Sequence, residues 1–256
     1  MKVFVDSDYD KLAQCIVVYP CNLQIGGNNT TKQQIDKKVA SNQYNNLINA
    51  LSDYGIKLHF FDLNDSSSQV FSRDIGFVIQ DILFISHMTL PDRQCEIDGL
   101  IEFVHKYNIK HHIMQNCAEG GDILVNHNKI FIGQGNRTCE KAVTEINEVL
   151  SANNMSFELI KVYFETSKIH LDCVFDILDK DTCIISEDIF NSQDVVKHFS
   201  KIIEAPRTEL DSLAINIISL DNITHLCSSE SFTQALQKQG FNTIYINFSE
   251  IIKASG

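Results

Sequence analysis

Basic residues are scarce in this sequence. Its 256 residues include 21 Lys and Arg against 33 Asp and Glu, which gives a formal net charge of −12. Binding to a phosphate backbone requires a basic surface, so this balance disfavours nucleic acid as a partner. The same balance is compatible with a small cationic substrate.

Long apolar runs, prolines and paired cysteines are also missing. No apolar run approaches the roughly 20 residues of a membrane helix, and Asp6, Asp8 and Asp10 stand where a signal peptide would be apolar. A cytoplasmic protein with no membrane partner is therefore expected. With only three prolines and no low-complexity linker, residues 1–256 are expected to form a single domain. The eight cysteines include no CxxC pair, which favours small buried apolar residues over disulfides or zinc ligands.

A repeat is the most informative feature that is present. Four apolar hairpins each begin with a short polar residue, at Asp74, Asp122, Asp172 and Asn216, with intervals of 48, 50 and 44 residues. Such a period indicates repeated supersecondary units. Taken singly, each polar residue is more simply explained as the cap of a strand. Four in register favour convergence on one axis, where ligand sites of repeat architectures lie.

Each repeat reads as hairpin, helix and strand, which is typical of the α/β class. The hairpins are expected at 74–86, 122–133, 172–186 and 216–227, with the first two turning near Gln80-Asp81 and Asn126-His127-Asn128. The clearest helical patterns cover about 31–54, 91–107 and 137–152, and further strands are expected at 15–20, 57–63 and 158–164.

Three short motifs hold candidate functional residues: FSRD (71–74), EGGD (119–122) and HLDCVF (170–175). Glycines after Glu119 allow close backbone approach or a positive φ. A tight turn ahead of a buried strand is the simpler explanation. His170 is two residues before Asp172, so on a strand both would face the same side. A lone histidine is usually structural, but the equivalent repeat positions favour a shared site.

The order of these motifs, followed by SEIIKASG (249–256) and with GQGNRT (133–138) between the last two, resembles the guanidino-group modifying superfamily. Its members include dimethylarginine dimethylaminohydrolases, arginine deiminases and amidinotransferases. The resemblance runs from about Cys15 to the last residue. It implies a five-bladed α/β propeller, the pentein fold, with pseudo-fivefold symmetry around a central, negatively lined site.

The resemblance also implies roles for individual residues. A guanidinium is a stable planar cation, so attack on its carbon needs carboxylates to hold it and a strong nucleophile, which is a cysteine thiolate in this superfamily. His170 would be the general acid and base, with Glu119 as its carboxylate partner. Asp74 and Asp172 would grip the guanidinium through charge-assisted hydrogen bonds.

Two arginines match the positions that bind the substrate's α-carboxylate in the superfamily. Arg93 follows Asp74 by 19 residues, and Arg137 follows Glu119 by 18. Bidentate or water-mediated pairing is expected for both. The alternatives are a solvated helix residue for Arg93 and a helix-start residue for Arg137. Many members also carry an acidic residue six positions before the first aspartate, where this chain has Ser68.

The nucleophile is the main departure from the pattern. In the superfamily it follows a stretch like SEIIKASG by a few residues, so a catalytic cysteine is expected beyond Gly256, near position 260, where a final strand is also expected. Cys227 lies at the end of the fourth hairpin, out of pattern, and is interpreted as structural.

The leading hypothesis is therefore a cysteine-dependent hydrolase that converts arginine or a methylated arginine to citrulline and ammonia or an alkylamine. Asp172 is typical of arginine deiminases and amidinotransferases, whereas the compact length is typical of dimethylarginine hydrolases. An amidinotransferase, or a non-catalytic guanidino binder if the chain ends at Gly256, are the alternatives. No cofactor or metal is expected, since the spacing of His111, His112 and Cys117 fits no standard metal site. The oligomeric state is open, with a homodimer as one option.

Overall fold

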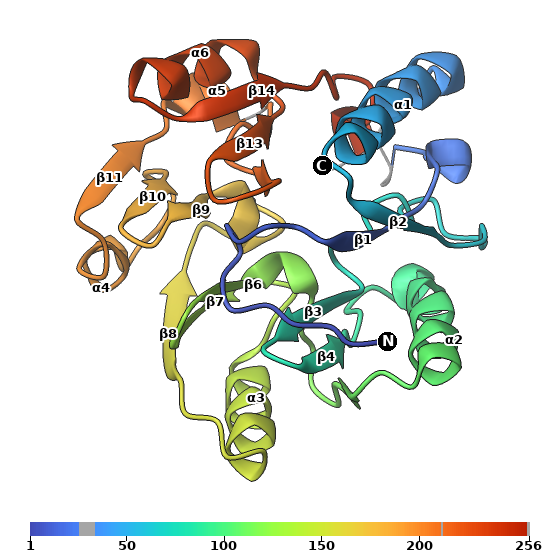
Figure 1. Ribbon diagram of the computed structural model, residues 1–256, viewed down its shortest axis with the longest axis vertical. Coiled ribbons are helices and arrows are strands. Elements are labelled where there is room, and N and C mark those ends of the chain that lie inside the picture. Colours follow the sequence, from blue (N-terminus) through green and yellow to red (C-terminus); the bar gives the residue numbers. More distant parts are fainter. Residues whose placement is uncertain (26–33, 211, 255–256) are drawn as a thin grey trace.

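The computed structural model describes residues 1–25, 34–210 and 212–254. In this part of the chain, five small β-sheets follow one another around a ring, and most of the helices lie at its periphery (Figure 1). The protein is a five-bladed α/β propeller with pseudo-fivefold symmetry, as the family resemblance implies.

Four of the blades have three strands each. In chain order these strands are β3 (Gly76–Ile79), β4 (Ile82–Ile85) and β5 (His111–Ile113); β6 (Ile123–Asn126), β7 (Lys129–Gln134) and β8 (Glu158–Tyr163); β9 (Phe175–Asp179), β10 (Thr182–Ile185) and β11 (Lys201–Glu204); β12 (Ile218–Ser219), β13 (Thr224–Cys227) and β14 (Asn242–Tyr245). In each blade the first two strands form an antiparallel hairpin, and the third pairs in parallel with the second. The predicted repeat of hairpin, helix and strand is confirmed.

The remaining blade has two described strands. β1 (Gln14–Val17) and β2 (Lys57–Phe60) pair in parallel, and α1 (Lys37–Asp53) connects them. They correspond to the second and third strands of the other blades. Both are shorter than the predicted strands at 15–20 and 57–63.

A helix connects the second and third strands of every blade. After α1 these are α2 (Asp98–Tyr107), α3 (Glu140–Ala152), α4 (Ser192–Val196) and α6 (Glu230–Lys238), while α5 (Arg207–Leu210) joins two blades. Single 3₁₀ turns are η1 (Pro20–Asn22), η3 (Gly120–Asp122), η4 (Leu171–Cys173) and η5 (Ile252–Ala254), and η2 (Pro91–Ile97) is longer.

The helix boundaries differ from the predicted ranges at their starts. Residues 31–33 lie outside the described part of the chain, and α1 begins after Asp36, whose carboxylate accepts two backbone N–H groups of the first turn. The predicted helix at 91–107 opens with the 3₁₀ segment η2 instead. The one predicted at 137–152 begins only at Glu140.

Two tight hairpin turns form where the sequence predicts them. Gln80 joins β3 to β4 with a φ of 51°, and His127 joins β6 to β7 with a φ of 53°. Positive φ at a loop residue gives a two-residue turn whose twist matches that of the strands.

The core lies between neighbouring blades. Phe77 and Phe84 of one hairpin pack in a common cluster with Ile123 and Ile132 of the next. Every residue of β4, β6 and β10 is buried, so their sequences read as nearly continuous apolar runs rather than as alternating ones. Removing apolar surface from water in this way is the main force that holds the ring together.

An N-terminal strap, residues 5–9, crosses the middle of the ring before β1 begins (Figure 1). Val5 pairs with Gln80 and Ser7 pairs with Asn126, which are residues at the tips of two different hairpins. The Tyr9 hydroxyl donates to the Asn126 side-chain oxygen at 3.2 Å. The strap therefore connects two blades directly.

No helix of the described residues is both long and apolar enough to cross a membrane. All eight cysteines lie in the described part of the chain and carry free thiols. Cys183 and Cys227 are buried, whereas Cys21 is exposed and the other five are half-buried, so the expectation of buried cysteines holds only in part.

Candidate active site

The starts of neighbouring hairpins are joined to one another by buried hydrogen bonds. The Asp74 carbonyl accepts the Gly120 N–H at 2.9 Å, and the Asp122 carboxylate accepts the Leu171 N–H at 2.8 Å. In the next pair of blades, the carboxylate of Asp176 accepts the backbone N–H of Ile217. Hairpin starts of neighbouring blades are therefore in direct contact, although in the fourth repeat the paired residue is Ile217 rather than Asn216.

Three of the predicted site residues form one buried cluster. His170 Nε2 lies 2.9 Å from Glu119 Oε2, and His170 Nδ1 lies 3.4 Å from Asp74 Oδ1. Their side chains are at most 9% exposed, and that of Glu119 is fully buried. The sequence-based expectation that Glu119, His170 and Asp74 converge is confirmed in this geometry.

Asp172 belongs to the same region, but not for the predicted reason. His170 and Asp172 do not lie on a strand, because Leu171–Cys173 form the 3₁₀ turn η4 that begins after His170. Both side chains instead border Gly121: a Cβ added there would lie 2.8 Å from His170 Cγ and 3.0 Å from Asp172 Oδ2. Asp172 is also 4.0 Å from the Arg73 guanidinium.

Close approach, rather than a positive φ, explains the two glycines after Glu119. Neither has a positive φ. A Cβ on Gly120 would lie 2.1 Å from the Arg73 carbonyl oxygen and 2.6 Å from that of Gly76. Side chains at these positions would push apart the hairpin starts on one side and the His170 ring on the other.

Arg93, which is expected to bind the α-carboxylate of the substrate, is paired with carboxylates of the protein instead. It lies in η2 and is 5% exposed, which rules out the solvated alternative. Its Nη2 donates to Asp74 Oδ2 at 3.0 Å and to Glu96 Oε2 at 2.7 Å, and its Nε donates to Glu96 Oε1 at 2.9 Å. Because Glu96 and Asp74 together take the Nε and Nη2 donors of this guanidinium, Nη1 is the nitrogen left to face a ligand.

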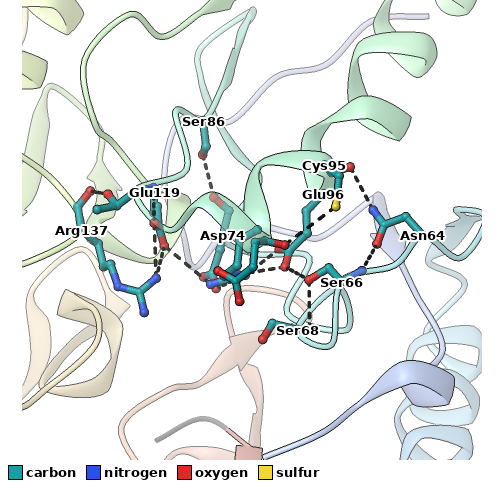
Figure 2. A network of polar contacts seen from close by, with 12 residues as sticks. Asn64, Ser66, Ser68, Asp74, Ser86, Cys95, Glu96, Glu119 and Arg137 are labelled. Atoms are coloured by element: carbon teal, nitrogen blue, oxygen red, sulfur yellow. Dashed lines mark hydrogen bonds and ion pairs between the residues drawn. The ribbon is translucent and has the colours of Figure 1, made fainter. Parts of the chain in front are cut away.

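Arg137 lies just before α3, beside the central glutamate. Its Nη1 is 3.2 Å from Glu119 Oε2, and Figure 2 shows the two side chains facing each other. Arg93 Nη1 is 3.7 Å from the same Glu119 oxygen. Both arginines therefore flank Glu119, so their guanidinium groups lie near each other.

Residues that sequence reasoning missed hold this arrangement in place. Glu119 accepts the Thr89 N–H at 3.0 Å, and its own N–H donates to the Thr138 hydroxyl at 3.1 Å. Glu96, fully buried, pairs with Arg93 and accepts the Ser66 hydroxyl at 2.5 Å. The i,i+3 spacing of Arg93 and Glu96 was a signal in the sequence, since such residues are neighbours on a helical segment.

The electrostatics of the cluster favour a protonated histidine. Burial alone would lower the pKa of His170, but the charge of Asp74 and the hydrogen bond to Glu119 raise that pKa to about 9. Burial would raise the pKa of Glu119, yet His170, the Thr89 N–H and Arg137 lower it to about 2. An imidazolium and a carboxylate thus face each other at neutral pH.

The surrounding aspartates are harder to ionise. Burial raises the pKa of Asp122 to about 7 and that of Asp172 to about 6. Burial also raises the pKa of Asp176 well above its usual value. Each of these groups would be stabilised in its charged form by an added cation.

Cys173, which lies beside the cluster, and Cys227, at the end of the fourth hairpin, are poorly suited to act as nucleophiles. Cys173 Sγ lies 3.6 Å from Asp172 Oδ1, and burial and the Asp172 charge raise the pKa of its thiol. Cys227 is buried, its thiol donates to backbone carbonyl oxygens, and burial raises its pKa. A nucleophilic cysteine needs the opposite shift.

Metal-ligating atoms occur in the cluster. One atom each of Asp74, Glu119 and His170 lie within 4.8 Å of one another. These atoms already contact one another or Arg93, so a metal ion would have to compete with those contacts. Elsewhere, His112 Nε2 is 2.7 Å from Glu145 Oε1, and His111 Nδ1 is 2.8 Å from a backbone carbonyl oxygen.

A five-bladed α/β propeller with carboxylates and a histidine at its centre defines the guanidino-group modifying class. Solved structures with this fold include a cysteine-to-serine variant of the Pseudomonas aeruginosa dimethylarginine dimethylaminohydrolase with citrulline, with a TM-score of 0.81, 19% identity and 96% of each chain covered. SxtG, an amidinotransferase from Microseira wollei in the saxitoxin pathway, has a TM-score of 0.83 and 15% identity, over 99% of this chain and 94% of its own. At these identities the likeness shows the fold.

Residues 24–256 match the family model described as "N,N dimethylarginine dimethylhydrolase, eukaryotic". The chain belongs to this family of hydrolases. A curated relative, the uncharacterized protein YkgA of Bacillus subtilis, is 30% identical over all of this chain and 92% of its own length.

Replacing Gly120 or Gly121 by alanine should destabilise the protein, and by different amounts. Gly120→Ala meets backbone oxygens, which cannot move easily, whereas Gly121→Ala meets the His170 ring, which can turn. We expect a loss of unfolding free energy of about 1–3 kcal/mol for Gly121→Ala and more for Gly120→Ala. Chemical denaturation measures both, and a Gly120→Ala variant as stable as the wild type would contradict the close approach.

Stability should depend on pH through His170. Its folded-state pKa lies above the unfolded value, so its contribution is fully present below about pH 6.5 and is lost as pH rises through about 9. Between these values the unfolding free energy of the wild type should fall by about 3 kcal/mol relative to His170→Gln. Denaturant titrations at each pH test this, and parallel curves for the two proteins would refute it.

Proposed function

We propose that this chain hydrolyses the guanidino group of arginine or a methylated arginine, giving citrulline and ammonia or an alkylamine. The observation that carries the proposal is the buried placement of His170 between Glu119 and Asp74. Nε2 of the imidazole is hydrogen-bonded to Glu119, whereas Nδ1 faces Asp74. A planar cation held by Asp74 would therefore lie next to Nδ1.

Asp74 and Asp172 are the proposed grips on the guanidinium. Asp74 is held by its backbone, since its carbonyl accepts the Ser86 hydroxyl at 2.6 Å (Figure 2). The same carbonyl also accepts the Gly120 N–H. Among the described residues, the side-chain contacts of Asp172 are long, at 3.6 Å from Cys173 Sγ and 4.0 Å from Arg73. An unsubstituted nitrogen of a guanidinium would supply the hydrogen bonds that this carboxylate can accept.

His170 is the proposed acid and base. With its pKa raised to about 9, it holds a proton at neutral pH and can give that proton to the leaving amine. Nδ1, which has the longer contact, faces Asp74 and thus the proposed ligand. The resulting neutral imidazole can then take a proton from the attacking water, while Glu119 keeps the ring in place.

A cysteine thiolate would supply the covalent step. It would attack the guanidinium carbon, the C–N bond to the amine would break as His170 protonates it, and water would then release the thiolate and the ureido product. A cysteine near position 260 stays a prediction, because that position lies beyond the 256 residues of the sequence. The alternative of a non-catalytic guanidino binder stays open with it.

An amidinotransferase is the second candidate within the class. Asp172, which the resemblance associates with amidinotransferases as well as with arginine deiminases, favours this alternative. In that reaction an amine, rather than water, takes the amidino group from the cysteine.

Product analysis tests these functions directly. The protein is incubated with L-arginine, with mono- and dimethylarginine, and with each of them plus an acceptor amine. Citrulline together with ammonia, methylamine or dimethylamine would support hydrolysis and identify the leaving group. A new guanidino compound that forms only with the acceptor would show that the protein is an amidinotransferase rather than a hydrolase. Binding without turnover would support the non-catalytic binder.

The two arginines should matter only for ligands that carry an α-carboxylate. We expect Arg137→Ala to weaken L-arginine binding by about 2 kcal/mol, or roughly thirtyfold in Kd, while agmatine binding changes little. Arg93→Ala should also weaken the binding of L-arginine without weakening the binding of agmatine. Isothermal titration calorimetry measures all four values.

Arg207→Ala is the matched control for this experiment. Arg207 is an exposed arginine whose guanidinium pairs with Glu187, so its loss removes the same charge far from the cluster. Equal losses for L-arginine and agmatine in the Arg137 variant would reject the α-carboxylate role.

A further inference from the structure

Glu96 is a buried carboxylate for which the proposed mechanism has no use. Its side chain is fully buried, and it accepts Arg93 Nε at 2.9 Å, Arg93 Nη2 at 2.7 Å and the Ser66 hydroxyl at 2.5 Å. Burying a charge is costly unless it is paired in good geometry. Here the geometry is a two-point pairing of carboxylate and guanidinium, which is the strong form of this ion pair.

The partner of Glu96 is itself a guanidinium. Arg93 Nη2 lies 3.0 Å from Asp74, and Arg93 Nη1 lies 3.7 Å from Glu119. These are the carboxylate proposed to grip the substrate and the one proposed to hold the histidine. Arg93 therefore carries the same chemical group as the proposed substrate. Because it is part of the chain, it can compete with the substrate for these carboxylates at any substrate concentration.

Counting donors shows how Glu96 limits this competition. A guanidinium side chain has five N–H donors, one on Nε and two on each Nη. Glu96 takes the Nε donor and one on Nη2, which leaves one Nη2 donor for Asp74 and two on Nη1. Arg93 can thus release Asp74 to a ligand by giving up one hydrogen bond while its pairing with Glu96 persists.

Ser66 connects this pair to a neighbouring loop. The Ser66 hydroxyl donates to Glu96 and accepts the Ser68 N–H at 3.1 Å, while the Asn64 side chain donates to the Cys95 carbonyl at 2.9 Å. Figure 2 shows these contacts as one continuous network beside Asp74. Glu96 is therefore fixed from two sides.

We propose that Glu96 is a positioning residue that restrains Arg93, so that the carboxylates of Asp74 and Glu119 remain available to a guanidinium ligand. Without Glu96, the Arg93 guanidinium turns fully onto these two carboxylates and competes with the ligand. This inference rests on the proposed function, since it assigns the same carboxylates to the substrate cation.

A double-mutant cycle with agmatine tests the inference. Agmatine carries the guanidinium but no carboxylate, so it reports on the cation site alone. We expect Glu96→Gln to weaken agmatine binding about tenfold in isothermal titration. Adding Arg93→Ala to this variant removes the competitor and should return the Kd to within about threefold of that of Arg93→Ala alone.

Two further variants keep the test decisive. Glu102→Gln removes an equal charge from an exposed position of α2 and should leave agmatine binding unchanged. Ser66→Ala keeps the Glu96 charge but removes one of its two supports, so it should weaken agmatine binding in the same direction by a smaller factor. This variant replaces Glu96→Gln in the cycle if the latter does not fold.

The outcomes separate this inference from the proposed function. Unchanged agmatine binding in Glu96→Gln, or an equal loss with and without Arg93, would overturn the restraint of Arg93. No binding of agmatine or L-arginine to the wild type or to Arg93→Ala would overturn the proposed function. The hydrogen exchange of the Arg93 Nε–H in NMR spectra gives a readout without ligand: slow exchange in the wild type and fast exchange in Glu96→Gln support the restraint, and equal rates contradict it.

Discussion

Burying negative charge at the point where the blades meet is the constraint on which the rest of the structure depends. Glu119, Asp122, Asp74, Asp172 and Asp176 are all at most 6% exposed. Carboxylates so placed need donors or counter-charges. Backbone N–H groups of the next blade supply some of these donors, so the contacts that satisfy the carboxylates also hold the blades together. Fold and site are thus stabilised by the same hydrogen bonds.

The counter-charges are what make the site chemically useful. His170, Arg93 and Arg137 are the cations that contact Glu119, and each of them is proposed to act on a ligand. A guanidinium that enters adds positive charge beside aspartates whose burial has made them hard to ionise. An added cation would stabilise the ionised form of these aspartates, so the electrostatics of the site favour a cationic ligand.

The sequence predicted the repeat and the residues at the starts of the hairpins because both are local patterns. It placed His170 and Asp172 on one side of a strand, whereas Asp172 lies in a 3₁₀ turn that begins after His170, and both side chains border Gly121. It treated Arg93 as a residue for the far end of a ligand and missed its ion pairs with Asp74 and Glu96. Such contacts depend on side-chain directions in three dimensions, which spacing along the chain does not specify.

The N-terminal strap has a consequence for how the ring comes apart. In repeat architectures each unit contacts mainly its neighbours, so units can open one at a time. The strap pairs with Gln80 and Asn126 on two hairpins, and Asp8 next to Ser7 contacts Arg73 at 3.4 Å, beside the central aspartates. Opening either hairpin therefore breaks one of the two pairings that hold the strap in place. This linkage makes unfolding cooperative across blades, and it ties the first few residues of the chain to the integrity of its centre.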